Sequence, residues 1–379
     1  MAGPEAEPQH RRIRIAVDAS TLIGPLTGPG VATTHLLDGL SAIEALEVSV
    51  FAKGLAAHDL DARLPKGVAH RQHRLPPRLV DRAWRSFGWP PIDRAIGRPD
   101  VVHSLGDLVP PVRHAAQIIT IHDAAPLVAP SLADASALRG WSSIVRAIRR
   151  GATVHCTTAA VADVVAEGLH LPRARIAVIP WGIPPLLTRE PVEVDDLVPR
   201  SVERSIVALG VDGPRKGISD LLAAFDQLAD DDPNLGLVII GRNGEGAPRT
   251  AVRHADRVVR TGPLSAGATR TLLANAHVLA VPSLLEGFGF PPLQAMTLRV
   301  PVVASNLAPL REVLGDAALY TEVASPSSLA HALDAVLSNE ALRRDLTIRG
   351  RARALQFSWT TTATAMAELY ARVAASPAG

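Results

Sequence analysis

EGFGFPPLQAMTLRVPVVAS, residues 286–305, places a carboxylate, two glycines and two prolines directly before a short helical run and a buried-type strand. Gly287 and Gly289 leave their backbone N–H groups unobstructed and permit positive φ angles. Pro291 and Pro292 suit the first turn of a helix, where a missing N–H costs no hydrogen bond. A helix that begins here directs its positive end toward the glycine turn, and this arrangement favours a phosphate group.

Two polar side chains accompany this turn. Glu286 precedes the glycines and offers an acceptor for hydroxyl groups, and Gln294, eight residues further on, returns a second polar group to the same side. Binding of phosphate and hydroxyl groups at one place predicts a sugar nucleotide as the ligand. The alternative is an ordinary strand–loop–helix turn whose glycines serve tight packing.

The composition is that of a globular protein with two domains. The chain has 379 residues, more than one compact core usually holds, with 47% hydrophobic and 20% charged residues. Its net charge of +2 lacks the basic excess of a dedicated nucleic-acid binder. Cys156 is the one cysteine, so no internal disulfide can form, and its place in a predicted strand indicates a buried structural thiol rather than a nucleophile. No Cys/His cluster has the spacing of a zinc site, so we expect no metal.

The N-terminus, MAGPEAEPQHRR (1–12), lacks the apolar run of a signal peptide and is expected to be a disordered leader. No stretch of about 18 uninterrupted apolar residues occurs, so no membrane span is expected. These two features predict a cytoplasmic location.

Alternating strand and helix patterns divide the chain into two α/β units. Residues 13–190 and 200–355 each predict a parallel, doubly wound sheet, and the polar stretch 187–205 is the expected linker. Ligands of such sheets bind at the carboxyl ends of the strands, so the binding cleft is expected between the domains. The predicted strands are 12–20, 48–52, 101–105, 117–123, 153–158 and 176–180 in the first unit, and 205–210, 235–241, 257–262, 277–283 and 300–305 in the second.

A second phosphate signal lies in LGVDGPRKGISDLL (209–222). A strand ends at Gly210, and Arg215 and Lys216 precede a helix. Two adjacent cations at a helix N-terminus concentrate positive potential where a diphosphate would lie. The alternative is a solvated charged turn before an ordinary helix.

Two further loops are weaker signals. His122 ends a strand near the expected cleft and could contact a sugar, although an isolated His-Asp dipeptide more often contains a structural histidine. Gly28 and Gly30, in TGPG before a helix, can bring bare backbone close to a ligand. This loop lacks the G-x-G-x-x-G and G-K-[ST] patterns, so neither a dinucleotide fold nor a P-loop is indicated.

The order of these segments resembles glycosyltransferase family 4, whose members have the GT-B fold: α/β, with two Rossmann-like doubly wound domains facing across a cleft. The segments that carry the resemblance are TGPG, the His-Asp after a strand, IAVIPWGI, GPRKG, PSLLEGFGFPPLQAM, VPVVAS and EVLGDAALY. FSWTTTATAMAELY resembles the family's terminal helix, which would make 356–379 a segment that crosses back to the first, acceptor-binding domain.

The resemblance implies a retaining, metal-independent hexosyltransferase that needs no cofactor. Arg215 and Lys216 would hold the donor diphosphate, and Glu286 would contact the sugar or its phosphate. Gln294 would hold the ribose, and His122 would reach the transferred sugar. The implied catalytic residues are His122, Arg215, Lys216 and Glu286; the implied donor-binding residues are Gly28, Gly30, Gly210, Arg215, Lys216, Gly262, Leu264, Glu286, Gly287, Phe288, Gly289, Phe290 and Gln294.

The resemblance predicts a GDP- or UDP-hexose donor, with mannose slightly preferred, and a hydroxyl acceptor on a glycan, a glycolipid or another small molecule. Three positions depart from the family pattern: Gln294 replaces a glutamate, Val211 replaces an arginine, and Arg299 with its neighbours replaces a turn of small residues. Two alternatives therefore stay open. One is an epimerase or hydrolase of the same fold, and the other is a non-catalytic module that binds sugar nucleotides.

Residues 71–98 combine basic and aromatic side chains. The segment holds seven arginines against two aspartates, with Trp84, Phe87 and Trp89 interleaved. This composition suits an anionic membrane surface or a lipid-linked acceptor, and would place the protein at the inner face of the membrane. The alternative, which we favour slightly, is a helical excursion of the acceptor domain whose aromatic side chains pack inward.

Overall fold

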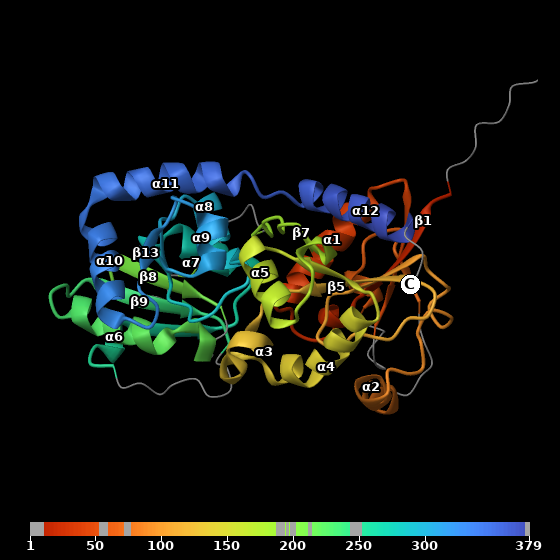
Figure 1. Cartoon of the computed structure of the whole chain (residues 1–379). Helices are drawn as coiled ribbons and strands as arrows, with labels where there is room; N and C mark the ends of the chain where they lie inside the picture. Colours follow the sequence, from red (N-terminus) through yellow and green to blue (C-terminus); the bar gives the residue numbers. More distant parts are fainter. Residues whose placement is uncertain are drawn as a thin grey trace, which may run out of the picture.

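The computed structural model describes residues 11–52, 60–71, 77–186, 194, 197, 202–210, 214–242 and 252–375. They form two α/β domains that lie side by side (Figure 1). Residues 1–10 of the predicted leader, most of the predicted linker 187–205, Val211 and residues 376–379 lie outside the described residues.

The first domain contains a seven-stranded parallel sheet in the order β3-β2-β1-β4-β5-β6-β7. Its central strands are buried on both faces because helices cover both sides. The strands are β1 Ile13–Asp18, β2 Leu46–Phe51, β3 Ala69–His70, β4 Val101–Ser104, β5 Ala116–Ile121, β6 Thr153–Cys156 and β7 Ile176–Val178. The helices are α1 Gly28–Ser41, α2 Pro77–Ser86, α3 Ala125–Val128, α4 Ala135–Arg149 and α5 Ala159–Gly168.

The second domain contains a six-stranded parallel sheet in the order β10-β9-β8-β11-β12-β13. The strands are β8 Arg204–Leu209, β9 Leu235–Ile240, β10 Val258–Gly262, β11 Val278–Val281, β12 Val302–Ser305 and β13 Leu319–Thr321. The helices are α6 Ile218–Ala229, α7 Ala266–Ala274, α8 Phe290–Thr297, α9 Ala308–Leu314, α10 Pro326–Ser338 and α11 Glu340–Ala354. The predicted pair of doubly wound domains is confirmed, while the short strands β3 and β13 were not predicted.

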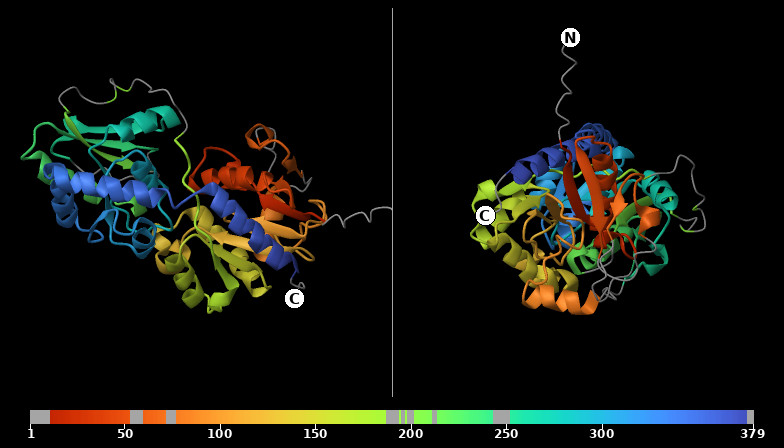
Figure 2. Two further views of the ribbon diagram at one scale, coloured as in Figure 1. Left: turned by 90° about the horizontal axis from the view of Figure 1, so that it is seen from above. Right: turned by 90° about the vertical axis from the view of Figure 1, so that its right-hand side faces the viewer.

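The last helix, α12 (Trp359–Ala375), packs against α1 of the first domain. In Figure 2, α11 runs over the second domain and α12 follows it over the first. Thr362 Oγ1 donates to the carbonyl oxygen of Pro180 at 2.7 Å, which joins the two chain crossings between the domains. Gly182 is required here, because a Cβ would lie 2.4 Å from the backbone nitrogen of Trp359.

Aromatic rings extend this junction into both domains. Trp181 stacks on Trp359 with ring centroids 5.7 Å apart, and Trp359 stacks on His35 of α1 at 5.4 Å. The ring centroid of Phe290, the first residue of α8, lies 6.4 Å from that of Trp359. The crossing segments thus contact the start of α8, beside the glycine turn.

A buried hydrogen-bond chain holds α12 to the first sheet. Tyr370 of α12 bonds to His103 Nδ1 at 2.8 Å, and His103 Nε2 bonds to Thr120 Oγ1 at 2.7 Å. Thr120 Oγ1 bonds to His155 Nδ1 at 2.9 Å, and His155 Nε2 bonds to the carbonyl oxygen of Ile179 at 2.9 Å. A carbonyl oxygen only accepts, so Nε2 of His155 carries a proton, and with both imidazoles neutral every donor meets one acceptor.

Acidification is expected to weaken the fold through this chain. Burial lowers the pKa of His155 to about 4, below an unfolded value of about 6.5, so the unfolded state binds the proton more readily. The stabilisation is present above pH ~6.5 and is lost as the pH falls toward 4; at pH 5 one such histidine lowers the free energy of unfolding by about 2 kcal/mol. Urea unfolding followed by tryptophan fluorescence at pH 7 and pH 5 measures this loss.

His155→Gln removes the titrating group and provides the comparison. The variant is less stable at pH 7, but its free energy of unfolding should change less between pH 7 and pH 5. An unaltered pH dependence in the variant would contradict the assignment of the effect to His155.

Cys156 is fully buried in β6, and burial raises the pKa of its thiol to about 12, so the predicted structural role is confirmed.

The aromatic residues of 71–98 differ in their exposure to solvent. Trp84 of α2 is buried, whereas Phe87 and Trp89 are 77% and 68% exposed. The expectation that these rings pack inward is therefore right for Trp84 and wrong for the other two. Within the described part of the chain, no helix is both long and apolar enough to cross a bilayer.

Candidate active site

The glycine turn of 286–290 ends directly at α8. Gly289 is the N-cap residue with φ of 102°, and the prolines occupy the first turn of the helix, as predicted. Gly287 does not have a positive φ; its small size is needed because a Cβ there would lie 1.8 Å from the carbonyl oxygen of His122 in the other domain. The turn therefore lies against the first domain.

The loop after β8 carries the two cations. Leu284 N–H donates to the carbonyl oxygen of Arg215 at 2.8 Å, which anchors this loop to the segment before Glu286. Gly217 has φ of 62° and caps α6, and a Cβ at this position would lie 2.0 Å from the carbonyl oxygen of Pro282. The backbone thus fixes Lys216 close to the segment that contains Glu286.

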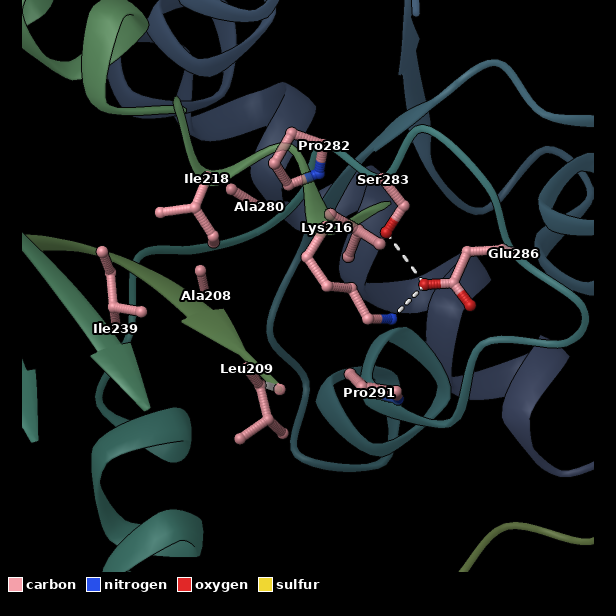
Figure 3. A pocket seen from close by; sticks show the side chains of 12 residues that line it. Ala208, Leu209, Lys216, Ile218, Ile239, Ala280, Pro282, Ser283, Glu286 and Pro291 are labelled. Carbon is pink, nitrogen blue, oxygen red and sulfur yellow. Dashed lines mark hydrogen bonds and ion pairs between the residues drawn. The ribbon is translucent and has the colours of Figure 1, made fainter. Parts of the chain in front are cut away.

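Lys216 forms an ion pair with Glu286, and Ser283 Oγ donates to the same carboxylate oxygen at 2.8 Å (Figure 3). The Glu286 side chain is only 8% exposed. Burial alone would raise the pKa of Glu286, but the charges of Lys216 and Arg215 hold it below its ordinary value. Glu286 is therefore a carboxylate at neutral pH and accepts hydrogen bonds.

These side chains line a small cavity at the carboxyl ends of β8 and β11, beside Gly210 and Pro291 (Figure 3). Its volume is about 20 Å³, close to the space of one water molecule. Gly210 has φ of 141°, and its carbonyl oxygen lies where a Cβ on Gly241 would be. Close backbone packing thus shapes this end of the sheet.

Arg215 reaches across to the first domain. Its Nη1 donates to Asp123 Oδ2 at 2.8 Å, and Asp123 Oδ1 accepts from the backbone N–H of Ala125 at 3.0 Å. The neighbouring His122 bonds through Nε2 to the carbonyl oxygen of Leu105 at 2.9 Å, so its Nδ1 is the unprotonated nitrogen. Burial lowers the pKa of His122, which keeps the ring neutral.

Further contacts hold the two domains together beside this ion pair. Thr158 Oγ1 donates to the carbonyl oxygen of Gly287 at 3.1 Å. The carboxylate of Glu312, in α9, accepts from the backbone N–H groups of Ala159 and Ala160 at 2.7 and 2.9 Å, at the positive end of α5. The cleft is thus closed along the glycine turn.

Gln294 points its amide nitrogen to the carbonyl oxygen of Pro184 at 3.1 Å, in the crossing between the domains. A glutamate at this position would lose the bond to Pro184, because a carboxylate cannot donate. The contact with Pro184 therefore favours an amide over a carboxylate at residue 294.

The structure brings His122, Arg215, Lys216, Glu286 and Gly287 together, with Gly210 beside them. The remaining predicted residues are more dispersed. Gly28 and Gly30 begin α1 in the first domain, Phe288 is buried, and Phe290 starts α8. Gly262 ends β10 at the sheet edge, and Leu264 follows this strand. A Cβ on Gly30 would lie 2.6 Å from the carbonyl oxygen of Thr21, so Gly30 is needed for internal packing.

Asp123, Ser283, Thr158 and Glu312 were not predicted as site residues. Asp123 was visible in the His-Asp dipeptide, and Ser283 precedes Glu286 by three residues, but no pattern indicated their partners. Among the described residues, no group of three or more His, Cys, Asp and Glu side chains is arranged to hold a metal ion.

Comparisons with known proteins agree with this architecture. Residues 26–185 match the family model described as Glycosyltransferase Family 4, and residues 194–353 match that described as Glycosyl transferases group 1. The O-antigen chain mannosyltransferase B of Escherichia coli is 44% identical over 26% of this chain and 26% of its own. The MMP alpha-(1->4)-mannosyltransferase of Mycolicibacterium hassiacum is 31% identical over 63% of this chain and 60% of its own.

Each of these alignments covers less than two thirds of the curated relative. Among solved structures, sucrose-phosphate synthase from Thermosynechococcus elongatus superposes with a TM-score of 0.72 at 20% identity, over 95% of this chain and 99% of that chain. At this identity the superposition supports the fold alone.

Proposed function

The chain belongs to the family 4 glycosyltransferases with the GT-B fold, and from this premise we propose that it transfers a hexosyl unit from a nucleoside diphosphate sugar to an acceptor hydroxyl. The observation that carries the proposal is the convergence of Arg215 and Lys216 with Glu286 at the carboxyl ends of β8 and β11. Two cations beside a glycine turn suit a diphosphate, and a carboxylate next to them suits sugar hydroxyls.

The proposed chemistry is electrostatic. As the bond between the sugar and the diphosphate breaks, negative charge grows on the leaving phosphate, and Arg215 and Lys216 offset it. The ring of His122 is neutral, and its unprotonated Nδ1 accepts a hydrogen bond from a hydroxyl group of the transferred sugar. We propose retention of the anomeric configuration and turnover without a metal ion, because side-chain cations supply the charge that a metal would otherwise provide.

The mannosyltransferase names of the two relatives favour mannose as the sugar transferred. We propose GDP or UDP as the nucleotide of the donor. We propose that Gln294 holds the ribose through its amide oxygen and that residues around Gly262 and Leu264 border the base. The acceptor is proposed to be a hydroxyl of a glycan, a glycolipid or a small molecule bound by the first domain.

A thermal-shift screen followed by product analysis tests this function. GDP or UDP should raise the melting temperature, and ADP should not. With GDP-mannose or UDP-glucose and a panel of acceptors, nucleoside diphosphate should be released only when an acceptor is present, and EDTA should not abolish its release. Sugar release or epimerisation without an acceptor would favour the hydrolase or epimerase alternative, and binding without turnover would favour the binding module.

We also propose that the first domain meets an anionic membrane surface through α2 and the segment after it. A groove of about 740 Å³ beside α2 is lined by Arg113, Arg146, Arg149 and Arg150, and its described lining contains no carboxylate. The same segment of the sequence contains three exposed apolar side chains, those of Leu79, Phe87 and Trp89. Arginines and exposed aromatic rings together suit the boundary between lipid headgroups and acyl chains.

Replacing Phe87 and Trp89 by serine is expected to reduce binding to vesicles with 30% anionic lipid about tenfold or more, because the exposed rings supply the apolar contact. Cosedimentation measures the bound fraction. Ile348→Ser with Leu355→Ser, which removes two exposed apolar side chains of the second domain, is the matched control. If the two double variants bound to the anionic vesicles in equal fractions, this membrane surface would be contradicted. Binding of the wild type to neutral vesicles as strongly as to anionic ones would also contradict it.

A further inference from the structure

The charges at the candidate diphosphate site are already balanced. Arg215 pairs with Asp123, and Lys216 pairs with Glu286, so two cations face two carboxylates. All four side chains are at least partly buried, with exposed fractions of 8% to 27%, so solvent screens these pairs only in part. A diphosphate that arrives here meets a site of no net charge.

The two carboxylates differ in their attachment. Glu286 lies in the same domain as its cation and is fixed by Ser283, so it stays beside Lys216. Asp123 belongs to the other domain, where the N–H of Ala125 fixes its Oδ1 and leaves Oδ2 for Arg215. Separation of the domains would withdraw Asp123 and give the site a net positive charge.

We propose that Asp123 is a positioning residue that competes with the donor diphosphate for Arg215 and thereby links nucleotide binding to separation of the domains. This inference rests on the proposed function. With the cleft closed, a diphosphate at Arg215 and the Asp123 carboxylate are like charges at one guanidinium. The bond from Arg215 to Asp123 therefore opposes entry of the donor, and recapture of Arg215 by Asp123 assists release of the nucleoside diphosphate product.

Asp123→Asn separates this role from a structural one. The asparagine Oδ1 can still accept from the N–H of Ala125, but its NH₂ group then faces Arg215 and cannot accept a hydrogen bond. The substitution thus cuts the bond between the domains and leaves the turn at Ala125 intact. Asp134→Asn is the matched control. Asp134 lies in the first domain, as Asp123 does, and adds negative potential near Arg215. Among the hydrogen bonds of the described residues, none joins Asp134 to Arg215.

Isothermal titration of the full chain with GDP and with UDP provides the main measurement. Asp123→Asn is expected to tighten nucleoside diphosphate binding about tenfold, the size of one charge-assisted hydrogen bond that no longer has to be broken. The product inhibition constant should fall by the same factor. Asp134→Asn should change binding less than twofold, and in an Arg215→Ala background Asp123→Asn should no longer tighten it.

Unchanged or weaker binding by Asp123→Asn would overturn the inference, as would equal tightening by Asp134→Asn or tightening that persists without Arg215. Glu312→Gln tests general loosening of the closed cleft, because Glu312 bonds the other domain at α5 and not at the cations. Tightening by Glu312→Gln that persists in an Arg215→Ala background would overturn competition for Arg215. If the wild type binds neither GDP nor UDP, the proposed function fails together with the inference; if the wild type binds and Asp123→Asn changes nothing, only the inference fails.

Discussion

Replacement of both Arg215 and Lys216 by alanine is expected to lower kcat/KM for the donor by at least about a thousandfold. Loss of one preorganised charge donor typically costs 10²- to 10³-fold, and here both are lost. The substitution also leaves Asp123 and Glu286 as carboxylates without their cations, so the site changes from neutral to doubly negative. Steady-state kinetics and titration with nucleoside diphosphate should both show the loss.

The backbone of the loop should survive this change. Leu284 bonds to the carbonyl oxygen of residue 215, and Gly217 caps α6, and neither contact uses the replaced side chains. Arg351→Ala, which removes an exposed cation of the same domain, is the control and should leave kinetics near the wild-type values. Turnover of the double variant within tenfold of the wild type would refute the role of the two cations.

Exchange of the cations, Arg215→Lys with Lys216→Arg, refines this result. The net charge is kept, so nucleotide binding should recover in large part. The kcat should recover less, because the planar guanidinium and the compact ammonium place their donors differently. The exchange thus separates the contribution of charge from that of geometry.

The parts of this site that follow from local sequence were predictable. The prolines of 291–292 mark the first turn of α8, and Gly289 provides the left-handed residue before it. Short continuous runs of apolar residues predicted the main strands of both sheets, because strands that are buried on both faces have such runs. β3 was missed because two residues are too few to form such a pattern, and β13, with three residues, was missed as well.

The contacts between domains were not predictable from local sequence. Arg215 and Asp123 are 92 residues apart, and Gln294 and Pro184 are 110 residues apart. Their meeting depends on how two separately folded units are placed, and no periodicity or turn signal encodes that placement. The same holds for Gly287, whose glycine serves contact with the other domain rather than a positive φ.

Gly287→Ala is expected to lower kcat about a hundredfold or more, while nucleoside diphosphate affinity is kept or rises, because an opened cleft withdraws Asp123 from Arg215. The added Cβ would lie 1.8 Å from the carbonyl oxygen of His122, a distance that backbone atoms cannot accept, so the cleft cannot close as it does here. A displacement of about 1 Å between reacting groups can cost 10²-fold in rate. The cations and Glu286 all lie in the second domain, so the nucleotide site itself should remain.

Small-angle scattering and kinetics together test this expectation. Gly287→Ala should show a larger radius of gyration than the wild type, and opening of the cleft should also break the bond from Thr158 to the carbonyl oxygen of residue 287. Gly28→Ala is the steric control, because a Cβ at Gly28 meets no atom within 4 Å and the scattering should match that of the wild type. A Gly287→Ala enzyme with wild-type kcat would mean that catalysis occurs in a more open cleft, and that the contact between Gly287 and His122 belongs to a resting state.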